Sequence, residues 1–502
     1  MLSNKSSSDF LNRQQNRIHA YVDQLLALLV QAERPAERPA ERPRAGLPRL
    51  KGWRFTLSIG RSLSLSIVDN ELGDVYGPPT ARDSLGGGIY LIWEDDRRTS
   101  TTLDRYTVMN FEQCLKEWRA LSFTELYGPD ILAPGIYPEV AMLDEAILPL
   151  VEGDTTLFYR ILSQGQRELQ ANGALFVDAS TNASLTTSYI CNSKGLNLSY
   201  SSTGFSFSFF ADSLYGNGYS KRRLCPEGEV EVVLDDIKTM LPFFKQEGQF
   251  VSRADRPALG TASPSDHPAE PPVGDSVLLG SNVAVSFVST FLLSNLYGSR
   301  VVNGQAAFEK GDFLAKKAVI REDISLMLDS LRPYEFSAGR LTGEGVPGGR
   351  VALIEKGRLN TPILDLKYAN LMGLPPTPAG SVYMEIANQP SPDGAVSHSV
   401  PSHMAEAVSQ RKSLPELIRQ VDHGLLVYVL MGMHTQDGTS GRYSVSAPRS
   451  LVIGQGEFKG VVKTTLTGNF FDNLNDPRTT FGWDPREDNP AMLIQCQAST
   501  AQ

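Results

Sequence analysis

Histidines and the carboxylates near them are the residues of this chain best suited to chemistry. His398 and His403 could clamp a metal ion, because imidazole is a common ligand of transition metals. Pro401 lies between them and rules out a regular helix, and no glutamate follows the first histidine. His434 lies close to Asp437 in a turn that reads HTQD. There it could donate to a turn carbonyl or help to hold a binding cleft.

Two further histidines favour structural roles. His423 stands between a charged helix end and Gly424, where the helix dipole would stabilise a positive charge. His267 lies in a proline-rich stretch, which predicts an exposed and inert side chain. The patterns HExxH, HExxxH and HxxxH occur nowhere in the sequence. The chain therefore lacks the helical histidine motifs that bind catalytic zinc.

A glycine motif at 343–348, GEGVPG, matches the GxGxxG fingerprint of dinucleotide-binding proteins. That fingerprint needs a strand before it and a helix that begins at its glycines. Here Pro347 lies inside the motif, and residues 350–359 favour a hairpin with a Lys-Gly turn. No P-loop and no GxSxG sequence is present. The sequence thus excludes a dinucleotide fingerprint, phosphoryl transfer through a P-loop and serine hydrolysis.

Length and charge limit the classes of protein further. A chain of 502 residues with 41% hydrophobic residues should form more than one domain, each with a packed core. A net charge of -9, with no basic cluster larger than residues 221–223, argues against binding to nucleic acid. The four cysteines lie far apart without CxxC spacing, which favours reduced thiols. No signal peptide or membrane-spanning run is evident near the N-terminus, so we expect a soluble cytoplasmic protein.

Composition divides the chain into four parts. Residues 1–52 read as an amphipathic helix followed by a Glu-Arg-Pro connector, and residues 53–252 as a mixed α+β domain. Residues 253–274 are rich in proline and polar residues, which is typical of a linker. Residues 275–502 read as a β-rich domain with many glycine turns. The expected fold class is α+β with two lobes, the second one mainly antiparallel.

Several elements of the 53–252 domain can be predicted individually. The region Trp53–Val68 favours strands, and residues 185–200 favour a hairpin with glycine at its turn. Helices are expected over 110–121, 139–148 and 156–171. Phe205, Phe207 and Phe209 alternate with serines, so one strand face is apolar. This stripe could grip a peptide, although packing under a helix is the commoner arrangement.

Two blocks in the second half of the chain carry a family resemblance. The segment 433–474 reads MHTQDGTSGRYSVSAPRSLVIGQGEFKGVVKTTLTGNFFDNL, a series of short strands joined by glycine turns. The segment 341–359 reads LTGEGVPGGRVALIEKGRL. Both resemble the TldD/PmbA family, known as modulators of DNA gyrase and as subunits of a metalloprotease. The resemblance is weak before about residue 180 and strong after residue 275.

The resemblance points to an apolar helix at 283–297 as the position of the family's metal site. In the catalytic branch this helix carries HExxxH, and a five-residue offset between ligands implies a locally widened turn. Aligned through the flanking Leu-Gly and Gly304, the three motif positions fall at Ser289, Thr290 and Ser294. Neutral hydroxyls are poor zinc ligands, so we expect no metal or catalytic residue in this chain. Apolar residues occur on nearly every face of this helix, so we also expect it to be buried at a subunit or domain interface.

The resemblance therefore implies a TldE/PmbA-like subunit without the metal site. Its partner would be a TldD-like subunit that holds zinc, and the heterodimer would cleave unfolded peptides or peptide precursors. Contacts to the peptide are expected at His434, Asp437, Ser440 and Asn469. One alternative is a non-proteolytic peptide- or protein-binding scaffold that forms a homodimer. Another is an enzyme with relocated ligands at His398, His403 and His434.

Overall fold

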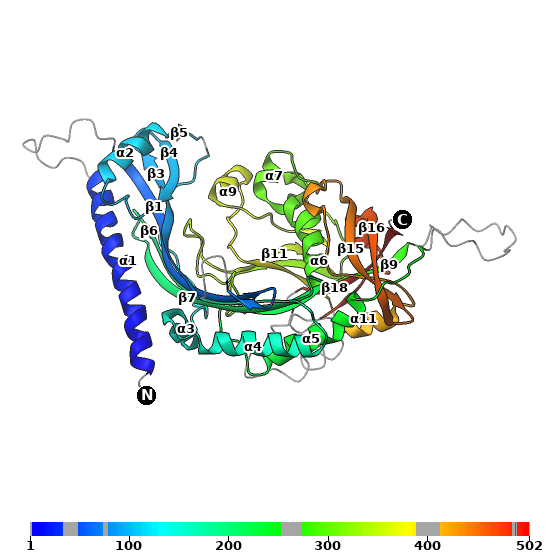
Figure 1. The fold of residues 1–502 in the computed structure, drawn as a ribbon. Helices are drawn as coiled ribbons and strands as arrows, with labels where there is room; N and C mark the ends of the chain where they lie inside the picture. The colour runs from blue at the N-terminus through cyan, green and yellow to red at the C-terminus, as the bar shows by residue number, and fades with distance from the viewer. Residues whose placement is uncertain are drawn as a thin grey trace, which may run out of the picture. The chain divides into compact units, whose positions relative to one another are not determined.

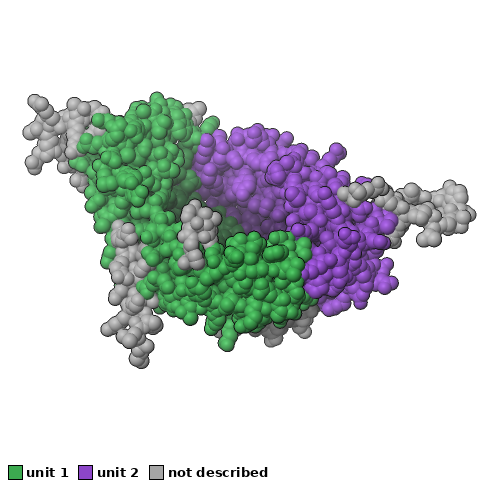
Figure 2. Space-filling model, viewed as in Figure 1, with its two compact units in different colours: residues 1–239, 329–349, 378–381 green, residues 240–328, 350–377, 382–502 purple. Residues whose placement is uncertain are grey.

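The computed structural model describes residues 3–33, 49–73, 79–125, 127–252, 274–387, 412–483, 487 and 489–500. The chain forms two compact units (Figure 2). Unit 1 comprises residues 1–239, 329–349 and 378–381, and unit 2 comprises residues 240–328, 350–377 and 382–502. The proline-containing connector after residue 33 and the expected linker up to residue 273 lie outside the described residues. So do His267, His398 and His403.

Unit 1 is built on one large sheet with the strand order β5-β4-β3-β1-β6-β7-β8, and β2 pairs with β1. Its strands are β1 Leu50–Val68, β2 Glu71–Leu72, β3 Thr80–Trp93, β4 Arg97–Leu103, β5 Phe123–Thr124, β6 Val177–Asn192, β7 Asn197–Ala211 and β8 Tyr215–Lys221. The helices of this part are α1 Ser3–Glu33, α2 Phe111–Ala120, α3 Leu148–Glu152, α4 Thr156–Ala171 and α5 Glu229–Phe244, which runs on into unit 2. Every strand pair in this sheet is antiparallel.

The two faces of the sheet differ in chemistry because side chains alternate along each strand. One face is apolar and contacts α1, α3 and α4, which Figure 1 shows beside these strands. The opposite face carries small polar side chains: Ser58 pairs with Ser188 and Ser62 with Ser184 across β1 and β6. The hydroxyls of Ser58 and Ser188 are 2.8 Å apart. The central strands thus present a neutral surface of hydroxyls on one side and a packed core on the other.

Helix α1 contributes Ile18, Val22, Leu25 and Leu29 to the core of unit 1, which confirms the amphipathic helix expected there. These residues recur every three or four positions and so form one stripe. Among the helices in the described residues, none is both long and apolar enough to cross a membrane.

The helices expected over 110–121 and 156–171 are confirmed as α2 and α4, but the helix expected over 139–148 is wrong. Residues 139–144 are irregular, and helical structure begins only at Glu145. The carbonyl of Met142 accepts a hydrogen bond from the Thr203 N–H (2.9 Å), and that of Ala141 from the Tyr334 N–H (2.8 Å). Tertiary pairing of the backbone therefore replaces the helical ladder that the apolar spacing favoured.

The hairpin around Gly195 and the aromatic stripe on β7 are both confirmed. Phe205, Phe207 and Phe209 are buried, and Phe209 lies directly under α4 at Gly165. A Cβ atom at residue 165 would lie 2.0 Å from the Phe209 ring, so only glycine allows this approach. The stripe packs under a helix and is not available to a peptide.

Unit 2 contains a small sheet with the order β12-β11-β10-β13 and a larger one with the order β16-β15-β14-β9-β18-β17. The strands are β9 Asp275–Leu279, β10 Ile324–Asp329, β11 Arg350–Glu355, β12 Arg358–Leu359, β13 Ser381–Ile386, β14 His423–Val427, β15 Arg442–Gly454, β16 Glu457–Asn469, β17 Thr480–Gly482 and β18 Ala491–Thr500. The helices are α6 Ser281–Phe287, α7 Gly298–Val302, α8 Lys310–Leu314, α9 Leu366–Met372, α11 Leu414–Gln420 and α12 Phe470–Asn475.

The larger sheet of unit 2 closes on itself, because residues 464–467 of β16 also pair with residues 497–500 of β18. Its pairs are antiparallel except for β9 with β14. Because the sheet closes, most of its strands have no open edge. The closed sheet surrounds a core that includes Val445, Leu466 and Ile494. The α+β fold class and the β-rich second half are confirmed.

The glycine motif at 343–348 is a turn, as expected. Gly345 has a φ of 87°, and Leu341 bridges to Pro347. The following segment is the predicted hairpin of β11 and β12, with Lys356 and Gly357 at positive φ in its two-residue turn. No helix begins at these glycines, so the dinucleotide reading is excluded by the fold as well.

The contact between α4 and β7 gives a stability prediction. We expect Gly165→Ala to lower the free energy of unfolding by about 1–3 kcal/mol, because the new methyl group must displace the buried Phe209 ring. Gly311→Ala is the matched control, since nothing lies within 4 Å of a Cβ at that position in α8. Ala favours helix over Gly by about 1 kcal/mol, so this variant should be neutral or more stable. Chemical denaturation of both variants is the measurement, and equal effects would contradict the packing argument.

Candidate functional site

The segment that aligns with the family's metal-binding helix is helical but irregular. Helix α6 ends at Phe287, a π-helical turn covers Val288–Leu292, and a 3-10 turn covers Leu293–Leu296. The N–H of Leu293 donates to the carbonyls of both Ser289 and Val288, four and five residues earlier. The widened turn that a five-residue ligand offset requires is therefore present in this chain, which has hydroxyls at 289, 290 and 294.

Aromatic packing fixes this helix on the closed sheet. The Phe287 ring lies 4.9 Å from the Tyr443 ring on β15 and 5.4 Å from the Phe470 ring at the start of α12. Phe291, one turn later, lies 5.8 Å from Phe470. Burial raises the pKa of the Tyr443 hydroxyl well above its ordinary value, and this hydroxyl donates to Asn473 Oδ1 (2.9 Å). The widened turn is thus held by aromatic packing in the core.

Within the single chain this helix is not buried on every face, and its burial at a subunit interface stays a prediction. Asn282, Val285 and Ser289 are exposed on one side, and Thr290 and Ser294 are half-buried. These positions recur at helical spacing, so the apolar residues between them fill only the opposite side. The Ser294 hydroxyl donates to the Thr290 carbonyl at 2.5 Å, one turn earlier, as expected for a serine within a helix.

Asn295 joins this helix to two other segments. Its side chain is fully buried, and its Nδ2 donates to the carbonyls of Phe291 (2.7 Å) and Gly438 (2.8 Å). Its Oδ1 accepts from the N–H of Ala307 at 2.8 Å. One amide therefore satisfies three backbone groups in the core, and it fixes the DGTSG turn at 437–441 against the helix.

The DGTSG turn is compact and polar. Asp437 Oδ1 accepts from the Thr439 hydroxyl (2.6 Å) and from the Thr439 N–H (3.0 Å), and these bonds hold the pKa of the Asp437 carboxyl below its ordinary value. Gly438 is buried against the helix, since a Cβ there would lie 2.5 Å from the Thr290 carbonyl oxygen. The turn leaves no space for a larger residue at this point.

The four residues expected to contact a peptide are only partly brought together. Asn469 donates to the Ser440 carbonyl (3.1 Å), and the Ser440 hydroxyl donates to the Asp437 carbonyl (3.3 Å). Asn469 also caps α12, where its Oδ1 accepts from Phe471 N–H at 2.9 Å. His434 lies exposed in the 3-10 turn Met433–Thr435, outside this chain of hydrogen bonds. Direct contact of any of the four with a peptide stays a prediction.

A hollow of about 620 Å³ lies beside the DGTSG turn on the ends of β15 and β16. Of the four expected residues only Asn469 lines it, and the other lining residues are Gln436, Arg442, Tyr443, Ser444, Thr467, Gly468 and Asp472. Sequence reasoning missed Gln436, although it lies between His434 and Asp437 in the same turn. Its importance comes from its pairing with a distant strand, which no local pattern reveals.

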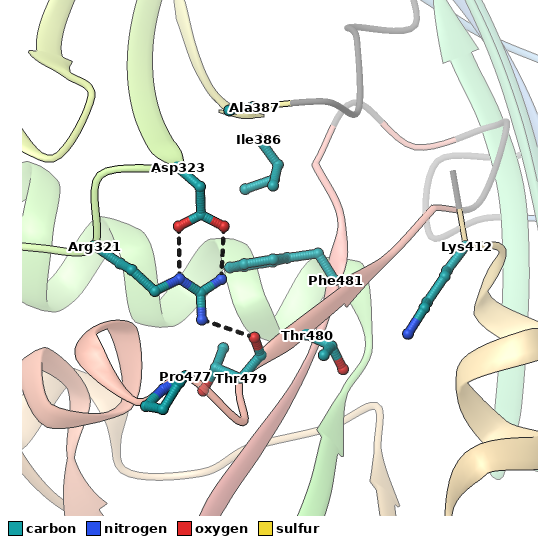
Figure 3. A pocket seen from close by; sticks show the side chains of 9 residues that line it. All are labelled: Arg321, Asp323, Ile386, Ala387, Lys412, Pro477, Thr479, Thr480 and Phe481. Atoms are coloured by element: carbon teal, nitrogen blue, oxygen red, sulfur yellow. Dashed lines mark hydrogen bonds and ion pairs between the residues drawn. The ribbon is translucent and has the colours of Figure 1, made fainter. Parts of the chain in front are cut away.

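A second pocket of about 320 Å³ is lined by residues from several loops of unit 2 (Figure 3). Arg321 binds both carboxylate oxygens of Asp323, at 2.6 and 2.8 Å, and the carbonyls of Asp476 and Thr479. Lys412, on the opposite side in Figure 3, donates to Gln420 Oε1 at 3.2 Å. Both cations are therefore committed to protein partners, and the arrangement is that of a structural ion pair.

Within the residues that the structure describes, no group of three or more His, Cys, Asp or Glu side chains could hold a metal ion. The expectation for His423 is wrong in detail, because it begins β14 and does not end a helix. Its ring stacks on Phe250 at 4.9 Å, and its Nε2 lies 3.0 Å from the Val251 carbonyl. The four cysteines form no disulfide, and burial raises the pKa of the Cys496 thiol to about 12.

Comparison with known proteins places this fold. Residues 275–483 match the family model of the PmbA/TldA metallopeptidase C-terminal domain. The structure of TldE from Thermococcus kodakarensis is similar over 90% of this chain and 97% of its own, with 16% identity and a TM-score of 0.70. A proposed modulator of DNA gyrase from Bacteroides thetaiotaomicron gives 17% identity and a TM-score of 0.65, with 90% and 95% covered. A proposed modulator of DNA gyrase from Thermotoga maritima has 16% sequence identity and a TM-score of 0.65. The similarity covers 89% of this chain and 96% of that chain. No curated protein matches the sequence.

The fold defines an α+β protein of the TldE type, with a widened helix packed on a closed β-rich sheet. At 16–17% identity the solved structures show the fold alone, and the matched domain at 275–483 supplies the relationship in sequence. The domain at 275–483 thus matches the PmbA/TldA metallopeptidase C-terminal domain in sequence, and the chain shares the fold of TldE.

Asn295 provides a test of how the site is held together. Asn295→Leu should lower the free energy of unfolding by about 2–4 kcal/mol, because it leaves buried backbone groups of Phe291, Gly438 and Ala307 without their partner. Ser289→Ala, exposed on the same helix, should change stability by less than about 0.5 kcal/mol. Guanidinium unfolding monitored by tryptophan fluorescence measures both. An Asn295→Leu variant as stable as the wild type would refute this role.

Proposed function

We propose that this chain is a TldE/PmbA-like, non-catalytic subunit of a heteromeric metalloprotease that acts on unfolded peptides or peptide precursors. The observation that carries the proposal is the pairing of a widened helical turn with hydroxyls at 289, 290 and 294. The backbone has the geometry that a five-residue ligand offset needs, whereas the side chains are poor ligands for zinc. A TldD-like partner would supply the zinc, and we place the pair in the cytoplasm.

The exposed side of the same helix supports the proposal that a partner subunit binds this chain. Val285 is 36% exposed, and Asn282 beside it donates to the Tyr428 carbonyl at 3.0 Å. In the segment that follows Tyr428, the side chains of Val429 and Met431 are 45% and 60% exposed. These two segments are joined by the Asn282–Tyr428 hydrogen bond, and we infer that a second protein chain covers their exposed apolar side chains. A homodimer could cover the same surface, which keeps the scaffold as the alternative.

Zinc content tests the absence of a metal site. The purified chain, dialysed against micromolar zinc and then against buffer, should retain far less than one zinc per chain, because Ser289, Thr290 and Ser294 offer no imidazole, thiolate or carboxylate. Elemental analysis gives the stoichiometry. About one zinc per chain would instead support the enzyme with relocated histidine ligands.

Cleavage by a reconstituted pair tests the division of labour. With a TldD-like partner and an unstructured peptide, Ser289→Ala in this chain should leave the cleavage rate within about twofold, since an exposed hydroxyl with no catalytic role is removed. Replacing a metal-binding histidine of the partner should abolish cleavage. Cleavage that survives loss of the partner's site would make this chain the catalyst and overturn the proposal.

A further inference from the structure

The side chain of Gln436 imitates a residue of a β-strand. Its Oε1 accepts from the Ser444 N–H at 2.9 Å, and its Nε2 donates to the Ser444 carbonyl at 3.2 Å. A primary amide carries the same donor and acceptor as a peptide group, so it pairs with both backbone groups of one strand residue. Nε2 also donates to the Gly432 carbonyl at 2.9 Å, which ties the amide to its own turn.

This pairing lies on the edge of β15 that does not face β16. Residues 442–447 of β15 pair with β16 on one side. On the other side Met431 forms an antiparallel bridge with Ser446, with N–H···O distances of 2.8 and 3.1 Å. Alternate residues of a strand present their backbone groups to the same edge, so Ser444 is the next position after Ser446. The Gln436 amide therefore stands where a strand continuing past Met431 would place a peptide group.

The position is accessible from solvent. Ser444 and Arg442 are exposed, and Gln436 is half-buried. The hollow of about 620 Å³ opens beside them and is lined mainly by polar side chains, with Arg442 and Asp472 providing one charge of each sign. One charge of each sign gives the hollow no preference for a peptide of either net charge.

We propose that the Gln436 side chain is a reversible plug: it occupies the backbone groups of Ser444 at the edge of β15 until an extended, unfolded polypeptide arrives. One residue of that polypeptide then pairs with Ser444 and displaces the Gln436 amide. The inference rests on the proposed function, because it assumes that the chain meets unfolded peptide. The exchange replaces the two hydrogen bonds between the Gln436 amide and Ser444 with two equivalent bonds from the peptide backbone. It therefore requires no particular peptide side chain. In the absence of peptide the plug keeps this edge from pairing with other strands.

Removal of the plug is the central experiment. A fluorescein-labelled, neutral, unstructured decapeptide is titrated into the isolated full-length chain, and binding is followed by anisotropy. Gln436→Ala should bind it at least about fivefold more tightly, because the competing amide is gone. Gln305→Ala is the matched control: this exposed glutamine also belongs to unit 2 but lies outside residues 431–446 and outside the lining of the hollow, so the affinity should not change.

Hydrogen exchange locates the contact. In the wild type the Ser444 amide should exchange slowly, and Gln436→Ala should speed its exchange until peptide restores protection. A peptide with N-methylated backbone amides should neither bind tightly nor protect Ser444. Unchanged or weaker peptide binding by a folded Gln436→Ala variant would overturn the proposal, as would failure of both proteins to bind peptide.

A variant that does not fold still leaves a test in the wild type. With the glutamine side chains labelled with ¹⁵N, saturating peptide should shift the Gln436 NH₂ signal, assigned through Gln436→Glu. An unshifted signal at saturation would refute displacement. None of these measurements uses the catalytic partner. The proposal about Gln436 can therefore be refuted while the reconstituted pair still cleaves peptide, and it can be supported while the pair shows no cleavage.

Discussion

The candidate site depends on one buried amide. Asn295 binds backbone groups of its own helix, of the DGTSG turn and of the segment at Ala307, all within the core of unit 2. A polar group with no access to water must find partners inside the protein, so the three segments can only be placed together. The glycine at 438 follows from the same constraint, because any side chain there would meet the Thr290 carbonyl.

Control of strand edges is a second theme of unit 2. The larger sheet closes through β16 and β18, which removes edges from most of the ring. Where β15 extends past β14, Met431 and then the side chain of Gln436 occupy its outer edge. An exposed strand edge can pair with other strands, and a side chain that occupies the edge prevents this. The proposed plug at Ser444 rests on this arrangement.

Local patterns predicted the fold well where packing agrees with them. Alternation identified the buried stripe of β7, and glycine placement identified the β11–β12 hairpin. The segment at 139–144 escaped prediction because its carbonyls pair with Thr203 and Tyr334, distant in sequence. The alignment of Ser289, Thr290 and Ser294 depended on the family motif. The pairing of Gln436 with Ser444 depends on tertiary placement, and no single-sequence pattern encodes it.

The widened helical turn has a consequence for how such proteins diverge. Because Phe287, Phe291 and Asn295 fix the turn from its buried side, the positions at 289, 290 and 294 contribute little to its shape. Selection can therefore exchange the side chains there without disturbing the backbone. Point substitutions at these positions can therefore change the chemistry of this surface while the product keeps its fold. Chemical activity and architecture become separately heritable traits in such a lineage.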